Sequence, residues 1–143
     1  PLDFSRVRLQ QADAYDLAAS VERSDFDAAF AGLWFSHVPV LSRPAFVRSL
    51  HRRLQPGARV VFIDNNEAQL RDFPVAETDA TGDTYQHRAL ADGSVHRVLK
   101  NFPTEAELRA LLAPVADEIC FRQLDNLWWL DYRFNGETLP DSA

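Results

Sequence analysis

Residues 26–39 read FDAAFAGLWFSHVP, a short apolar run followed by a glycine, two large aromatic rings and an imidazole. Residues 26–31 are apolar at nearly every position, which predicts a strand buried on both faces of a parallel sheet. Gly32 lets the backbone approach another group closely. In open α/β sheets, ligands bind outside the carboxyl ends of the strands. We therefore predict that residues 31–39 border a binding crevice.

A helix and a second strand follow this run. Apolar side chains three and four positions apart predict a helix over residues 43–54, with Ser42 as its N-cap and Pro44 in its first turn. Residues 58–63 are again almost wholly apolar and predict a second buried strand. Strand, helix and strand form one right-handed βαβ unit.

The rest of the chain carries further local signals. Alternation predicts a strand over residues 7–13, and Asp92-Gly93 predicts a hairpin turn. Thr104 and Glu107 form a capping-box pattern at the start of another helix. The remaining predicted elements are the hairpin strands 85–90 and 94–100 and a closing antiparallel pair at 119–124 and 127–134.

Composition restricts the kind of partner. The chain has 143 residues and a net charge of -6, which suits one soluble domain and disfavours nucleic-acid binding. No apolar run is long enough to cross a bilayer, so we expect no membrane partner. The single cysteine, Cys120, favours a reducing, cytoplasmic location. Because the sequence begins without methionine, we expect it to be a piece of a longer protein.

The order of these elements resembles that of class I S-adenosylmethionine-dependent methyltransferases. The resemblance is carried by the strand ending at Asp13, the strand 26–30 followed by Ser-His-Val-Pro, the turn LQPGARVV at 54–61, and the closing strand pair. It implies an α/β, Rossmann-like fold with a mostly parallel sheet and a closing antiparallel strand pair. It also implies S-adenosylmethionine as cofactor and a small-molecule methyl acceptor as partner.

The chain departs from the family at its amino-terminal side. The family sheet has the order 3-2-1-4-5-7-6, and its first two strands and Gly-rich cofactor turn have no counterpart among the five isolated glycines. The resemblance therefore implies that residues 1–143 are a partial methyltransferase domain, with a hairpin insertion at 84–100 and a frayed tail at 135–143. The strand 26–31 then becomes an open edge. Either a missing N-terminal segment or a second copy in a homodimer completes the sheet.

The family's cofactor residues can be carried over to this sequence. Asp13 would accept a hydrogen bond from the adenine amino group, and the backbone of Ala14 would meet the ring. Ala31, Gly32 and Leu33 would line the cofactor by backbone approach. The alternatives are that Asp13 is a turn residue and that Gly32 is a bend made for packing.

His37 is the candidate catalytic residue, because an imidazole can take a proton from the methyl acceptor as a general base. The equally weighted alternative is a histidine bonded to the backbone, since orientation alone can catalyse this transfer. The candidate substrate-binding residues are Trp34, Phe35, Asp64, Asn65 and Lys100. Core packing and turn chemistry are the alternatives for these positions.

The four histidines, His37, His51, His87 and His96, lack metal-ligand spacing, so we predict no metal site, and we expect His51 to be solvated beside two arginines. The predicted function is methyl transfer to O, N or C of a small molecule. A non-catalytic dimerisation or scaffold domain of the same fold is the alternative. Half of a nucleotide-binding dehydrogenase is a weaker option, because its sheet would be parallel.

Overall fold

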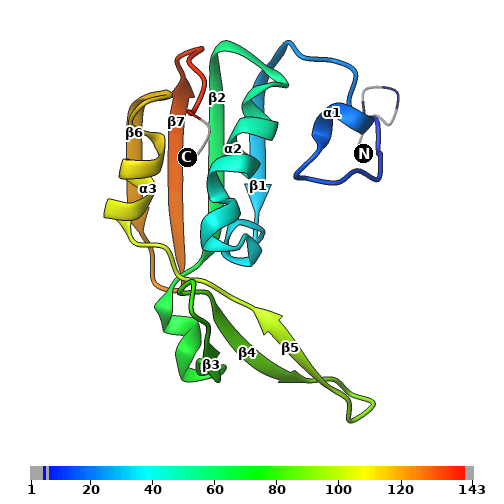
Figure 1. Cartoon of the computed structure of the whole chain (residues 1–143), viewed down its shortest axis with the longest axis vertical. Helices are drawn as coiled ribbons and strands as arrows, with labels where there is room; N and C mark the ends of the chain where they lie inside the picture. The colour runs from blue at the N-terminus through cyan, green and yellow to red at the C-terminus, as the bar shows by residue number, and fades with distance from the viewer. Residues whose placement is uncertain (1–4, 6, 141–143) are drawn as a thin grey trace.

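The computed structural model describes residue 5 and residues 7–140; the expectations for residues 1–4 and 141–143 lie outside this part. One four-stranded sheet forms the body, with α2 (Arg43–His51) and α3 (Glu105–Leu112) on the same face (Figure 1). Its strand order is β1-β2-β7-β6. The strands are β1 (Phe26–Gly32), β2 (Leu54–Asn65), β6 (Ala116–Gln123) and β7 (Leu127–Phe134).

The pairing in this sheet confirms the predicted mixture of parallel and antiparallel strands. β1 and β2 run parallel, with Gly32 opposite Ile63. β7 is antiparallel to β2, with Trp128 opposite Asp64, and β6 is antiparallel to β7. Parallel neighbours place their carboxyl ends together, so Gly32 and Asp64 lie at one end of the sheet.

The two helices begin in different ways. The capping box of α3 is confirmed, because Glu107 N donates to Thr104 Oγ1 (3.2 Å) and Thr104 N donates to Glu107 Oε2 (2.7 Å). Ser42 is the N-cap residue of α2 and Pro44 lies in its first turn, as predicted, but the Ser42 side chain makes no capping bond. The 3-10 turn η3 (Val40–Ser42) leads directly into α2 and gives Ser42 a helical backbone rather than the extended one that capping needs.

Aromatic side chains fill the space between the sheet and α2. Phe35 stacks on Phe62 with ring centroids 5.4 Å apart, and Phe46 lies 6.0 Å from each of these rings. Trp128 and Tyr132 of β7 close the cluster, and all five are almost fully buried. Each such side chain contributes about 1.5–3 kcal/mol when removed from water. This core fixes the segment that follows β1.

A smaller sheet extends from the carboxyl end of the body (Figure 1). It contains β3 (Glu77–Thr78), β4 (Thr84–Ala89) and β5 (Val95–Leu99), and it follows the 3-10 turn η4 (Glu67–Arg71). The predicted hairpin is confirmed: β4 and β5 are antiparallel, and Gly93 in the turn has φ 84°.

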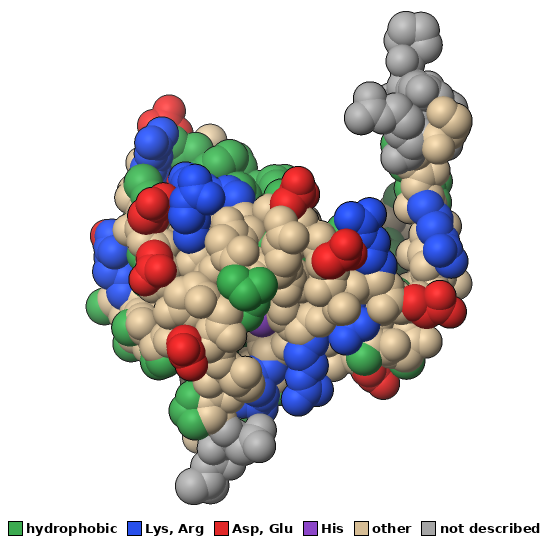
Figure 2. Space-filling view, turned by 90° about the horizontal axis from the view of Figure 1, so that it is seen from above, with side chains coloured by type: hydrophobic (Ala, Val, Ile, Leu, Met, Phe, Trp, Pro, Cys, Tyr) green, Lys and Arg blue, Asp and Glu red, His purple; other side chains and the backbone are tan. Residues whose placement is uncertain are grey.

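The outer side of β1 differs from the expectation. Residues 7–13 form no strand, and Phe30 of β1 is 69% exposed, so the predictions of a strand there and of burial on both faces of β1 are wrong. The physical reason is that β2 is the only strand of the described residues that pairs with β1. Between the N-terminal segment with its helix α1 (Leu17–Ser20) and β1 lies a hollow of about 680 Å³ (Figure 2).

The described part of the predicted tail, residues 135–140, contacts the body of the protein rather than lying free. Leu139 is 6% exposed, and Arg48 Nη1 donates to the Pro140 carbonyl at 2.9 Å. Residues 141–143 lie outside the described part. None of the helices in the described part has the length and apolar character needed to cross a membrane.

Candidate functional site

A buried polar cluster lies at the carboxyl end of β2. The Asp64 carboxylate accepts from Ser36 N (2.8 Å) and Ser36 Oγ (2.9 Å). Lys100 Nζ donates to Ser36 Oγ (2.7 Å), Asp64 Oδ1 (3.2 Å) and Asn65 Oδ1 (3.0 Å). Three segments far apart in sequence, the turn η2 (Phe35–His37), the tip of β2 and the end of β5, are therefore joined at one point.

These bonds involve Asp64 and Lys100, two residues predicted to bind substrate. Asp64 is fully buried and Lys100 is 2% exposed. An ammonium has three donors, and all three of Lys100 are used internally. Burial lowers the pKa of Lys100, although the attraction of Asp64 acts in the opposite direction. In this structure Asp64 and Lys100 bind each other and Ser36, and the substrate contact predicted for both stays a prediction. Asn65 is half-buried.

His37 lies next to this cluster with a defined ring orientation. Its Nδ1 is 2.7 Å from the Leu99 carbonyl oxygen, one residue before Lys100. A carbonyl can only accept, so Nδ1 carries the proton and Nε2 of the neutral ring holds a lone pair. The ring is half-buried. His37 thus makes the backbone bond that was one of its two predicted roles, and the general-base role stays a prediction.

A second polar group supports the same loop from the hairpin side. Asp83 Oδ1 accepts from Val40 N (2.8 Å) and from Asn101 Nδ2 (2.7 Å). Asn101 N in turn donates to the Ser36 carbonyl at 2.7 Å. Sequence reasoning missed Asp83, Asn101 and Ser36 as site residues. Only the position of Ser36 beside His37 gave a signal.

The residues predicted at the adenine end lie in the N-terminal segment. Asp13 Oδ1 accepts from Tyr15 N at 2.8 Å, so Asp13 has the turn role that was its alternative, and it is exposed. Ala14 packs against the core. The Tyr15 ring lies 6.3 Å from that of Trp34. This contact brings the segment to the same end of the sheet as the residues after β1.

The predicted backbone contacts follow β1 directly. Gly32 and Leu33 are exposed, and Ala31 packs against the core. Leu33 has φ 56°, a left-handed conformation that is uncommon for a residue with a side chain. A Cβ at Gly32 would lie 2.9 Å from the Phe30 ring. The Phe30 ring therefore occupies the space that a side chain at Gly32 would need.

The two rings after Gly32 have different environments. Phe35 is 1% exposed within the aromatic core, which is the packing role that was the alternative to its predicted substrate contact. Trp34 is half-buried, and its Nε1 is buried with no hydrogen-bond partner among the described residues. Trp34 thus remains a candidate for ligand contact, and Phe35 is a core residue.

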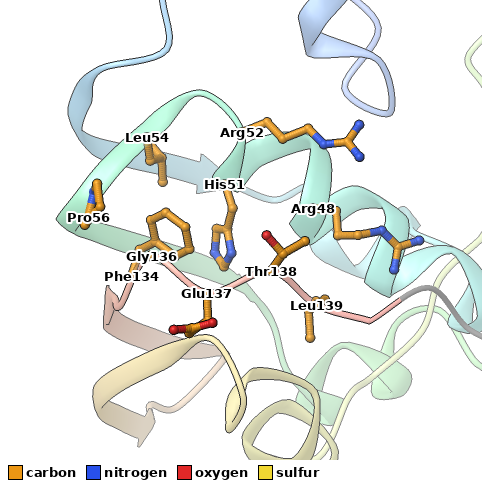
Figure 3. A pocket seen from close by; sticks show the side chains of 10 residues that line it. All are labelled: Arg48, His51, Arg52, Leu54, Pro56, Phe134, Gly136, Glu137, Thr138 and Leu139. Atoms are coloured by element: carbon orange, nitrogen blue, oxygen red, sulfur yellow. The ribbon is translucent and has the colours of Figure 1, made fainter.

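A separate hollow of about 240 Å³ lies at the opposite end of the sheet, beside the start of β2 (Figure 3). His51 points into it beside Phe134, whereas Arg48 and Arg52 extend away from the imidazole (Figure 3). His51 is 5% exposed, and its Nε2 lies 2.8 Å from the Tyr132 hydroxyl, so the expectation that it is solvated is wrong. This histidine belongs to the core and lies outside the cluster at His37.

Comparison of the fold with solved structures gives close matches. No family model matches the sequence, and no curated protein matches it. Two DhpI structures, an SAH complex and an SAM–HEP complex, are each 25% identical, with TM-scores of 0.57 and 0.63 over 76% and 87% of this chain. An SAM-dependent methyltransferase from Methanosarcina mazei is 19% identical, with a TM-score of 0.64 over 86%.

The chain has the class I methyltransferase fold. It spans 47% and 56% of the two DhpI chains and 65% of the Methanosarcina mazei chain, less than two thirds of each. On the plan of this methyltransferase fold, β1 and β2 are the fourth and fifth strands, and β7 and β6 close the sheet. The outer edge of β1 is where the plan places the first strand.

Proposed function

We propose that this chain is the acceptor-side part of an S-adenosylmethionine-dependent methyltransferase that acts on O, N or C of a small molecule. The observation that carries the proposal is the likeness to DhpI, which was solved with SAM and with SAH. The His37 site supports it, because an imidazole held by a hydrogen bond from Nδ1 to the Leu99 carbonyl lies near the carboxyl ends of β1 and β2.

The residues present fit one side of this cofactor. Gly32 and Leu33 are exposed, and Asp13 offers a carboxylate that can accept from the adenine amino group. The described residues contain no Gly-rich turn for the methionine end. We infer that the other side comes from a segment along the β1 edge, either N-terminal to this chain in the same protein or from a partner chain.

In this proposal the chain's own residues accept a proton and hold the reacting groups in position. When bound, the cofactor supplies a methyl group attached to a sulfonium sulfur. The thioether that would remain after transfer is a good leaving group and needs no further activation. His37 Nε2 would accept the proton released by an oxygen or nitrogen acceptor. The Leu99 carbonyl would hold the proton on Nδ1, and the Asp64–Lys100–Ser36 cluster would keep the loop in place. For a carbon acceptor, the same residues would contribute by holding the acceptor in the correct orientation.

Calorimetric titration of the full-length protein with S-adenosylmethionine tests the cofactor assignment. We expect one site per chain, and we expect Asp13→Ala to weaken binding about tenfold, because one hydrogen bond to a charged acceptor is lost. Asp27→Ala, on the exposed part of β1, is the matched control. Absence of binding would contradict the proposal and would favour the non-catalytic scaffold, for which sedimentation should then show a dimer.

Substitution of His37 tests the proton-transfer role. We expect His37→Ala to lower kcat about 100-fold with an oxygen or nitrogen acceptor, at the lower end of the range for general bases, because orientation is retained. The affinity for S-adenosylmethionine should stay unchanged, because the proposed role of His37 concerns the acceptor and not the cofactor. His96→Ala, in the exposed hairpin, should behave as wild type. Equal rates in the His37 and His96 variants would remove His37 from the chemistry.

A further inference from the structure

Arg43 is a buried cation without adequate partners. Its side chain is 9% exposed at the start of α2, and its Nε is buried with no hydrogen-bond partner in the described part of the chain. The nearest acid is Glu107, whose Oε1 lies 3.9 Å from Nη1, which is too far for a hydrogen bond. The Phe35 ring lies 5.7 Å below the guanidinium. A buried donor left in this state costs about 1–3 kcal/mol.

Arg43 lines a hollow of about 260 Å³, large enough for a fragment-sized molecule. The hollow lies between the starts of α2 and α3 and the base of the β4–β5 hairpin. Apolar side chains supply part of its wall, and Thr84 and Asn101 supply polar atoms. The apolar members are Val40, Leu70, Val75 and Phe102. A wall that combines apolar side chains with placed polar groups is typical of small-molecule sites.

The carboxylate of Glu107 also lines this hollow. One of its oxygens accepts hydrogen bonds within the capping box, and the other does not. Oε2 accepts from Thr104 N (2.7 Å) and Thr104 Oγ1 (3.0 Å) in the capping box. Oε1 faces Arg43. A guanidinium donor and a carboxylate acceptor thus lie side by side, close enough to bind adjacent acceptor and donor atoms of one planar group.

The charges around the hollow disfavour an anion. Two carboxylates, Glu67 and Glu107, line it beside the single cation. Burial lowers the pKa of Arg43, and the charges of Glu107 and Asp83 act to raise it, so two acids already lie near the guanidinium without bonding to its Nε. An added negative charge would meet these acids at close range in a partly desolvated place. The wall is therefore suited to an uncharged polar group.

We propose that this hollow binds a small molecule through an uncharged carboxamide-type group. Its carbonyl oxygen accepts from Arg43, and its amino group donates to Glu107 Oε1. All the lining residues belong to this chain, so the binding does not rest on the proposed methyl transfer and needs no cofactor.

Benzamide and benzoate are suitable probes, because they have nearly the same shape and differ in charge. In NMR titrations of the full chain, we expect benzamide to shift the amide signals of Thr84, Asn101 and Phe102. We expect benzoate to bind at least tenfold more weakly. If benzamide does not bind, or if benzoate binds as tightly as benzamide, the proposal is overturned.

Two variants assign the binding to these side chains. Arg43→Met should weaken benzamide binding at least tenfold, whereas Arg109→Met, on the exposed face of α3, should leave it unchanged. Glu107→Gln keeps a capping-box residue and removes a negative charge, so it should reduce the preference for benzamide over benzoate. The Glu107 variant decides the matter if Arg43→Met does not fold. Unchanged benzamide affinity in a folded Arg43→Met protein, or an unchanged preference in Glu107→Gln, would contradict the assignment.

Discussion

Replacing Lys100 with methionine is expected to lower the free energy of unfolding by about 3–5 kcal/mol, because it leaves the Asp64 carboxylate buried without its counter-charge. Asp64 is fully buried, and Lys100 supplies the only ammonium that reaches it in the described part of the chain. The methionine side chain is close in volume, so little of the loss comes from packing. Urea unfolding at pH 7 measures it, and the midpoint of thermal unfolding should fall by roughly 10 °C.

The double variant Asp64→Asn/Lys100→Met separates charge from packing. With both charges removed, its loss should be smaller than that of Lys100→Met alone, because the introduced asparagine needs no counter-charge and can still accept from Ser36 N. Arg109→Ala removes the exposed pair with Glu105 and should cost less than about 0.5 kcal/mol. If Lys100→Met cost no more than Arg109→Ala, the buried pair would not be what joins β2 to β5.

The same variant reports on the loop that carries His37. Leu99, whose carbonyl accepts from His37 Nδ1, is the last residue of β5, and Lys100 follows it directly. Loss of the Lys100 bonds to Ser36 and Asp64 frees the two segments that hold the imidazole from either side. We therefore expect the stability loss to be accompanied by greater mobility at His37.

The sequence predicted the elements that local signals specify. The capping box at Thr104 and Glu107 and the turn at Asp92-Gly93 depend on residues a few positions apart, and the structure has both. The strand pair β6–β7 was predictable because aromatic and β-branched residues are dense on each side of a short polar turn. The family resemblance then placed these elements in the correct sheet order.

The failures have a different physical origin. Alternation in residues 7–13 indicates a strand only if another strand pairs with it, and none in the described part does. Lys100 and Asp64 are 36 residues apart, so no local pattern shows that they neutralise each other. Residue type alone indicated exposed substrate contacts, because lysine and aspartate are seldom buried unless paired. The hollow at Arg43 could not be predicted either, because its lining residues come from segments that are far apart in the sequence.

His51 gives the second large expected effect, a loss of stability in acid. Burial lowers the pKa of His51 from 6.5 to about 4. In the unfolded chain the imidazole binds a proton below about pH 6.5, whereas the folded protein resists protonation until about pH 4. Between these values the unfolded state holds more protons. The free energy of unfolding should therefore fall as the pH decreases, by about 3 kcal/mol in total from this group.

A glutamine at this position is the informative change. In His51→Gln the side-chain amide can still hydrogen bond to the Tyr132 hydroxyl, which His51 Nε2 meets at 2.8 Å, but it does not titrate. Burial raises the pKa of Tyr132, so that hydroxyl stays neutral throughout the window. Protonation of carboxylates lowers the free energy of unfolding equally in wild type and variant. The difference between their acid-induced losses therefore reports the contribution of His51 alone. Urea unfolding at pH 7 and pH 4 should show about 3 kcal/mol less acid loss in His51→Gln, with His96→Gln matching wild type. An equal acid loss in wild type and His51→Gln would show that the imidazole is not excluded from water as its packing against Tyr132 and Phe134 requires.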